Sequence, residues 1–153
     1  MQRITLLTVG TLKESWAKAA AAQYLGRFRD MKVEVLELAA SKERDPVRQA
    51  ADESTRLLIA AERHKGQRWV LDERGIRVTS PEFAGLLSKA KDRGDGIILF
   101  LGGAYGLSEE IRKSANLVIR LSDMTLPHEL CRVLVLEQLY RAQEITKGSG
   151  YHH

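Results

Sequence analysis

The sequence predicts a single α/β domain in which a mainly parallel sheet is covered by helices on both faces. Short apolar segments alternate with longer amphipathic segments along the whole chain, and the links between them are short. Strict alternation of this kind is typical of β-α-β units, whose helices connect parallel strands. The length of 153 residues fits one domain, and we find no internal repeat, low-complexity segment or linker that would divide it.

Five segments have the pattern of strands. Residues 97–101 (IILFL) are the most apolar, and residues 33–38 (VEVLEL) alternate apolar and acidic side chains, as a half-buried strand does. The third strand is short and is followed by Asp72-Glu73-Arg74-Gly75, which indicates a turn. The predicted strands are residues 4–9, 33–38, 68–71, 97–101 and 117–121.

Five segments have the pattern of helices. Asp45-Pro46 and Ser80-Pro81 each place an N-cap residue before a proline at the first helical position. Ser108 precedes two glutamates, which are stabilised near the positive end of a helix dipole. The predicted helices are residues 15–28, 46–63, 81–93, a short helix after Ser108, and a long last helix over residues 128–147.

Composition excludes several classes of protein. Hydrophobic residues make up 44% and charged residues 29%, a balance that excludes collagen-like, disulfide-rich and largely disordered chains. The net charge of +4 is mild, so it permits a phosphate-bearing partner without requiring one. Cys131 is the single cysteine, which indicates a reducing, cytoplasmic location. No apolar run is long enough for a membrane span, and residues 4–9 are too short for a secretory signal.

Three strand ends are candidate binding loops, because ligands of open α/β sheets lie at the carboxyl ends of strands. They are Leu71-Asp72, the glycine loop at residues 102–107 (GGAYGL), and residues 121–127 (LSDMTLP). The glycine loop has neither the spacing of a Rossmann fingerprint nor the lysine of a P-loop. Its open backbone suits a nucleoside or an amino acid group better than a triphosphate. The alternative is that it is only a tight strand-to-helix turn.

The third loop mixes apolar and polar side chains, whereas exposed loops are mostly polar. Leu121, Met124 and Leu126 alternate with polar residues. Such a loop fits the wall of a pocket for an adenine and a thioether. The alternative is that its apolar side chains cap the core beneath the sheet.

No metal or nucleophile site is predicted. The four histidines are scattered and lack the spacing of ligand pairs on one helix face. Cys131 lies in an apolar helix and is interpreted as a small core residue. His128 begins the last helix and either caps it or lines the pocket.

The last helix is apolar almost all round, so we expect one of its faces to pack on the sheet and another on a second copy of the chain. Glu137 and Arg141 are spaced for an ion pair along this helix.

Five segments of the chain together resemble one family, that of the ribosomal RNA large subunit methyltransferase H. They are residues 99–107 (LFLGGAYGL), 121–128 (LSDMTLPH), 132–134 (RVL), 137–142 (EQLYRA) and the terminal Tyr151-His152. This family belongs to the SPOUT superfamily of methyltransferases. The resemblance implies one SPOUT domain over residues 1–153, with a C-terminal trefoil knot formed by about residues 68–147.

The resemblance also implies the reaction and the cofactor. The family methylates N3 of a pseudouridine in 23S, the large-subunit rRNA, on the assembled ribosome, with S-adenosylmethionine as methyl donor and no metal. Mapped by position, the cofactor-binding residues are Leu71, Gly102, Gly103, Leu121, Ser122, Asp123, Met124, Thr125 and Leu126.

Arg141, Tyr151 and His152 match positions that hold the RNA and orient the base, and are assigned to catalysis by the same resemblance. The tail of one subunit is then expected to complete the site of the other in a homodimer. His153 stands where the family tends to have a basic residue, and a neutral imidazole there would weaken a contact with phosphate. Two alternatives stay open: a frayed terminus for the tail, and a non-catalytic, dimeric ribosome-binding protein for the chain. A flavodoxin-like domain is disfavoured, because the first strand lacks the phosphate loop or acidic cluster it needs.

Overall fold

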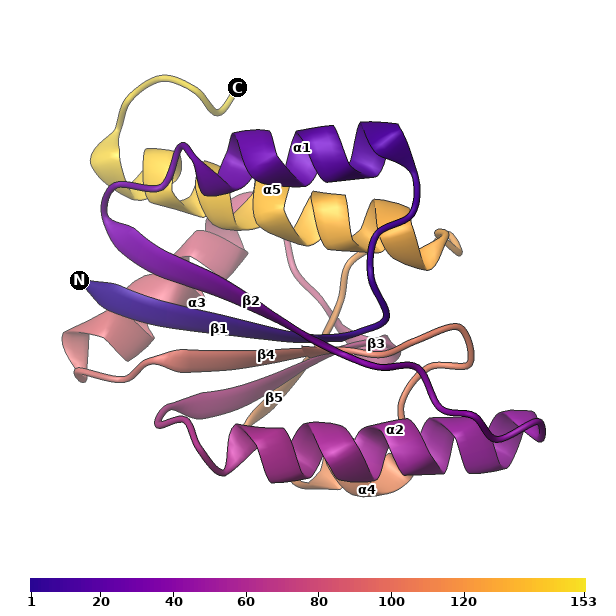
Figure 1. Ribbon diagram of the computed structural model, residues 1–153. Helices are drawn as coiled ribbons and strands as arrows, with labels where there is room; N and C mark the ends of the chain where they lie inside the picture. The colour runs from indigo at the N-terminus through magenta and orange to yellow at the C-terminus, as the bar shows by residue number, and fades with distance from the viewer.

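The computed structural model describes residues 1–153 and contains one sheet of five parallel strands (Figure 1). Their order across the sheet is β2-β1-β4-β3-β5. The prediction of a parallel α/β sheet is therefore confirmed. The strands are β1 (Gln2–Val9), β2 (Met31–Leu38), β3 (Gln67–Arg77), β4 (Ile97–Leu101) and β5 (Leu117–Arg120).

Helices cover both faces of this sheet, as predicted (Figure 1). One face carries α1 (Ser15–Leu25), α3 (Ser80–Asp92) and α5 (His128–Lys147). The opposite face carries α2 (Pro46–Ala61) and the short α4 (Glu109–Lys113).

Strand β1 contributes side chains to the hydrophobic cores on both faces of the sheet. Ile4 and Leu6 belong to the core cluster beneath α1, α3 and α5, whereas Leu7 and Val9 belong to the cluster beneath α2 and α4. Successive side chains of a strand point to opposite faces, so a strand buried on both faces is apolar throughout rather than alternating. This explains the continuous apolar run of β4 and the apolar residues on both faces of β1.

The helix caps mostly follow the prediction. The Asp45 carboxylate accepts from the Arg48 amide, and the Ser108 hydroxyl accepts from the Ile111 amide. The start of α3 is different, because Thr79 rather than Ser80 is the N-cap. Thr79 and Glu82 form a reciprocal capping box, and this places Ser80 inside the helix.

The prediction that the third strand ends at Leu71 is wrong. Strand β3 continues to Arg77, and both Leu71 and Ile76 are in register with Ile119 of β5. The residues between them form a bulge, although their sequence, Asp72-Glu73-Arg74-Gly75, is typical of a turn. At Gly75 a Cβ atom would lie 2.5 Å from the Ile119 carbonyl carbon, so only glycine allows this approach.

The last helix covers His128–Lys147, as predicted, but the reason for its apolar circumference differs. Leu136 and Leu139 have no exposed surface and belong to the subunit's own core, because α5 packs on the sheet and against α1 and α3. The circumference therefore does not by itself require a second copy, and the homodimer and the trefoil knot stay predictions.

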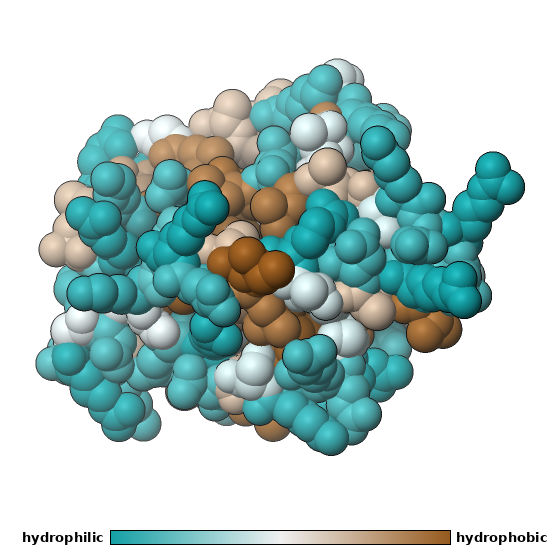
Figure 2. Space-filling view, turned by 60° about the horizontal axis from the view of Figure 1, so that its bottom comes forward, coloured by the Kyte–Doolittle hydropathy of each residue, from teal (hydrophilic) through white to brown (hydrophobic).

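The outer face that carries α2 and α4 is largely hydrophilic, with a small hydrophobic patch in its middle (Figure 2). Val47 and Ile59 of α2 are among the exposed large hydrophobic residues. No helix is both long and apolar enough to cross a membrane.

Candidate active site

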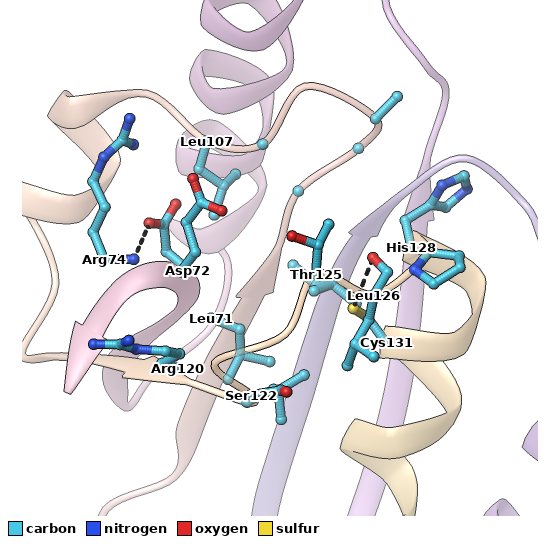
Figure 3. A pocket seen from close by; sticks show the side chains of 18 of the residues that line it. Leu71, Asp72, Arg74, Leu107, Arg120, Ser122, Thr125, Leu126, His128 and Cys131 are labelled. Carbon is cyan, nitrogen blue, oxygen red and sulfur yellow. Dashed lines mark hydrogen bonds between the residues drawn. The ribbon is translucent and has the colours of Figure 1, made fainter. Parts of the chain in front are cut away.

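A cleft of about 860 Å³ opens at the carboxyl edge of β3, β4 and β5 (Figure 3). The bulge of β3 and the loops that follow β4 and β5 line it, together with the first turn of α5. Ligand pockets of proteins commonly have volumes of roughly 300–1,000 Å³. The cleft is thus large enough for one nucleoside-sized ligand.

The glycine loop brings bare backbone to this cleft. A Cβ atom on Gly102 would lie 2.8 Å from the Gly106 carbonyl carbon, and one on Gly103 would lie 2.7 Å from Glu53 Oε1. Gly103 and Gly106 also form an isolated β-bridge. The loop is therefore a tight strand-to-helix turn and a wall of the cleft at once, so the two interpretations of the sequence do not exclude each other.

The third loop has the mixed character that the sequence suggests. Leu121 packs against the core, but Met124 is 79% exposed, so capping of the core does not account for the whole loop. Behind it, the Cys131 thiol donates to the Leu126 carbonyl, with sulfur and oxygen 3.7 Å apart. Burial raises the pKa of the Cys131 thiol, which fits a core residue rather than a nucleophile.

One ion pair links the bulge of β3 to α4, the short helix that follows the glycine loop. Asp72 and Arg112 approach to 3.5 Å, and their side chains are only 7% and 16% exposed. The Arg112 guanidinium also donates to the Leu107 carbonyl at 2.7 Å. Arg112 thus ties the end of the glycine loop to Asp72, at the start of the β3 bulge.

A second group of charges holds the loop of residues 121–127 in place. The Asp123 carboxylate accepts from Arg77 at 3.0 Å and from Arg120 at 2.9 Å. Arg120 also donates to the Gly75 carbonyl. The acid of this loop is thus compensated, and the cleft wall contains no lysine that would select a triphosphate. No three His, Cys, Asp or Glu side chains lie close enough together to hold a metal ion.

All of the residues predicted to bind the cofactor line this one cleft. They are Leu71, Gly102, Gly103, Leu121, Ser122, Asp123, Met124, Thr125 and Leu126.

The residues predicted for catalysis gather elsewhere, at the C-terminal end of α5. The Tyr151 hydroxyl donates to Glu137 Oε1 at 3.0 Å, and the Arg141 guanidinium lies 4.7 Å from the centre of the Tyr151 ring. His152 Nδ1 is 3.2 Å from Arg141 Nη1. Arg141 and Glu137 form the ion pair that their spacing predicts, at 2.8 Å. The tail is therefore docked on its own helix.

This arrangement fixes the protonation of the tail. Burial and the bond to Glu137 raise the pKa of Tyr151, and the bond to Glu137 raises the pKa of Arg141. At neutral pH Tyr151 stays neutral and Arg141 stays charged, so neither accepts a proton.

Within one chain, the cleft and the docked tail contact different parts of α5. The cleft is lined by His128 and Cys131 in the first turn, whereas the tail packs on Glu137, Tyr140 and Arg141. At 1.5 Å of rise per residue, His128 and Arg141 are about 20 Å apart along the helix, and Cys131 and Glu137 about 9 Å. In one subunit, the structure does not bring the predicted catalytic and cofactor-binding residues together.

The whole chain matches one known family. A family model described as "Predicted SPOUT methyltransferase" matches residues 2–152. The chain belongs to the SPOUT methyltransferase family. Its membership confirms the fold class and the family predicted from the motifs.

Several similar proteins carry the name ribosomal RNA large subunit methyltransferase H. One from Geobacter sp. (strain M21) is 43% identical, with 99% of each chain covered. One from Nitratidesulfovibrio vulgaris is 42% identical, with 100% of each chain covered. One from Caldicellulosiruptor saccharolyticus is 39% identical, with 97% of this chain and 99% of that protein covered.

A solved structure supports the fold alone. The crystal structure of a methylase family protein from Neisseria gonorrhoeae has a TM-score of 0.51 and 14% identity, covering 90% of this chain and 80% of that one.

Sequence reasoning about this SPOUT methyltransferase missed some buried charged groups, of which Glu53 has the clearest sequence signal. Glu53 is 1% exposed and lies on the same face of α2 as the buried Leu57 and Ala61, at four-residue spacing. A lone carboxylate on the apolar stripe of a helix is unusual enough to be selected as a candidate. Asp72 and Arg112 carry no such local signal, because their pairing depends on the bulge in β3.

Proposed function

We propose that the chain transfers a methyl group from S-adenosylmethionine to N3 of a pseudouridine in large-subunit rRNA on the assembled ribosome. Its membership of a methyltransferase family and the names of its full-length relatives support this function. A ribosomal substrate also implies a cytoplasmic location.

The main structural support for this proposal is that the bulge of β3 and the loops after β4 and β5 form one cleft. Its residues fit S-adenosylmethionine, because Gly102 and Gly103 line the cleft with backbone groups, at positions where a side chain would collide with Gly106 or Glu53. Leu71, Leu121 and Leu126 supply apolar surface for an adenine and a thioether, and Ser122 and Thr125 supply hydroxyls. The acids Asp72 and Asp123 in the wall are each paired with an arginine.

The task of the protein in this reaction is alignment. S-adenosylmethionine supplies a methyl group that is already activated by the positive sulfur. The bulge of β3 and the loops after β4 and β5 would hold the donor, and N3 would approach in line with the breaking S–CH₃ bond, a constraint worth several orders of magnitude in rate. S-adenosylhomocysteine would leave as the N3–CH₃ bond forms, and the N3 proton would pass to water.

We infer that Arg141 and Tyr151 position RNA rather than take the N3 proton. Their pKa values are both raised, so they remain a cation and a neutral phenol. A guanidinium pairs with phosphate and a tyrosine ring stacks on a base. His152, next to them, adds a donor or acceptor for the same contact.

We infer that the active unit is a homodimer in which the tail of one subunit serves the cleft of the other. The position of the tail supports this, because within one chain it packs on Glu137, Tyr140 and Arg141, whereas the cleft extends along α5 only to Cys131. Leu130 and Leu134, half-buried on α5, are candidates for the contact between subunits.

Transfer of tritium from labelled S-adenosylmethionine to ribosomes tests the function directly. Labelled large-subunit rRNA is expected. Binding to ribosomes without any transfer of label would instead favour the non-catalytic, dimeric ribosome-binding protein.

A further inference from the structure

A second cavity, of about 560 Å³, adjoins the proposed cofactor cleft at the carboxyl ends of β1 and β2. We refer to it as the β1–β2 cavity. The cavity and the cleft are both lined by Gly103, Ala104 and His128, so they meet at the glycine loop and the start of α5. This cavity has no role in the function proposed so far.

Glu53 of α2 lines this cavity and is not fully hydrogen-bonded. Its side chain is buried, and Oε2 accepts from the Ser41 amide at 2.8 Å. Its other oxygen, Oε1, is buried without any hydrogen-bond partner. A buried carboxylate oxygen without a donor is costly, so native proteins retain one rarely and often for a role in function.

This oxygen packs against Gly103 of the glycine loop. A Cβ atom there would lie only 2.7 Å from Oε1, so a side chain at this position would occupy the space beside the carboxylate. The free acceptor thus lies against bare backbone of the wall that the cavity and the cleft share.

We propose that the β1–β2 cavity is the subsite for the acceptor base, and that Glu53 accepts the N1–H of pseudouridine there. The proposal rests on the proposed function, and it assigns the part of the site that selects the substrate. The acceptor base has to lie beside the donor cleft for its nitrogen to reach the methyl group, and this cavity is the neighbouring space.

The chemistry of the cavity suits this base. Pseudouridine is joined to its ribose through carbon, so its N1 carries a hydrogen that uridine lacks. With N3 presented to the methyl donor, N1–H remains free to bond with a carboxylate. A site built around such a bond rejects a substrate that lacks the donor far more strongly than an apolar pocket would.

The decisive variant is Glu53→Gln. The Ser41 amide still needs an acceptor, so the carbonyl oxygen of the glutamine is held there and its NH₂ group replaces Oε1. Two donors then face each other when pseudouridine binds. Glu62→Gln, at the exposed end of α2, is the matched control.

The measurement compares methylation of ribosomes that carry pseudouridine with that of ribosomes that carry uridine at the same positions. For Glu53→Gln we expect roughly a 10- to 100-fold lower rate on pseudouridine, as for loss of a charged hydrogen bond, and little change on uridine. Affinity for S-adenosylmethionine, measured by calorimetry, stays at the wild-type value. An unchanged preference for pseudouridine, or a parallel loss of cofactor affinity, would overturn the proposal.

A second variant does not touch Glu53 and keeps the proposal testable if Glu53→Gln fails to fold. Ala40→Phe fills the exposed mouth of the cavity, and Ala51→Phe, on the exposed side of α2, is its control. We expect Ala40→Phe to abolish methylation while cofactor affinity is retained. Normal methylation by Ala40→Phe would refute the subsite alone, whereas wild-type protein that methylates neither ribosome would refute the proposed function.

Discussion

The hydroxyl of Tyr151 donates a hydrogen bond to Glu137, fourteen residues earlier in the chain, at 3.0 Å. The Tyr151 ring also meets Tyr140 edge-on, with 5.0 Å between ring centres. These contacts make the end of the chain an ordered part of the α5 surface. They also hold Arg141, Tyr151 and His152 as one group, which a second subunit can receive as a preformed unit.

Deletion of residues 151–153 is predicted to affect catalysis far more than stability. The lost contacts amount to about 1 kcal/mol, so Tm falls by roughly 2–4 °C. Methylation of ribosomes falls at least roughly tenfold, because stacking on an aromatic contributes about 1–3 kcal/mol per base. Affinity for S-adenosylmethionine, measured by calorimetry, remains unchanged. Full methylation by the truncated protein would show that the tail packs on α5 but has no role in the reaction.

Gly103→Val is predicted to weaken binding of S-adenosylmethionine about tenfold or more. The new Cβ lies 2.7 Å from Glu53 Oε1 and 3.3 Å from Val9 Cγ1, so the glycine loop has to shift, at a cost of roughly 1–3 kcal/mol. Gly85→Ala in α3 is the control, because nothing lies within 4 Å of its Cβ. Calorimetry that finds equal affinity for both variants would contradict the assignment of the cleft.

Arg132→Leu is predicted to destabilise the fold by about 2–3 kcal/mol, which is less than the roughly 3–5 kcal/mol for a fully buried pair because Glu37 is partly exposed. The guanidinium pairs with Glu37 and donates to the carbonyls of Val9 and Gly10. It thereby joins α5 to the ends of β1 and β2. Denaturant unfolding measures the change. Lys113→Leu, which breaks an exposed pair with Glu109, should change stability by less than about 1 kcal/mol.

Glu129 is predicted to make the fold sensitive to acid. Its carboxylate accepts from the amides of Lys13 and Glu14 at 2.7 and 3.1 Å, and these bonds lower its pKa from 4.5. A lowered pKa stabilises the fold above 4.5, and that contribution is lost as the pH falls through the folded-state value. Tm measured between pH 7 and 3 should therefore fall more steeply for the wild type than for Glu129→Gln. Parallel curves would contradict this, and Glu34→Gln serves as the exposed control.

Local patterns in the sequence predicted what is decided locally. The caps at Asp45 and Ser108 and the limits of α5 follow from residues within one or two turns. The continuation of β3 beyond Leu71 depends on pairing with Ile119, far along the chain, so the local residues resemble a turn. The burial of Leu136 and Leu139 in the subunit's own core could not be predicted either, because periodicity does not distinguish such a core from a contact between subunits.

The candidate site divides in the same way. The loops around Gly103 and Leu121 could be selected from their composition and position after strands, and the structure places them in one cleft. The unpartnered oxygen of Glu53 could not be foreseen, since it depends on the approach of α2 to the glycine loop. The separation of the tail from the cleft likewise could not be predicted without knowing where each of them contacts α5.

One experiment tests directly whether this chain methylates a pseudouridine of large-subunit rRNA. Ribosomes lacking this modification are incubated with the protein and S-adenosylmethionine, and the methylated nucleotides are mapped by mass spectrometry. We expect one added methyl group, on N3 of a single pseudouridine, and a strong reduction of this methylation when residues 151–153 are deleted. Methylation at another kind of nucleotide, or no added methyl group on ribosomes that bind the protein, would contradict it.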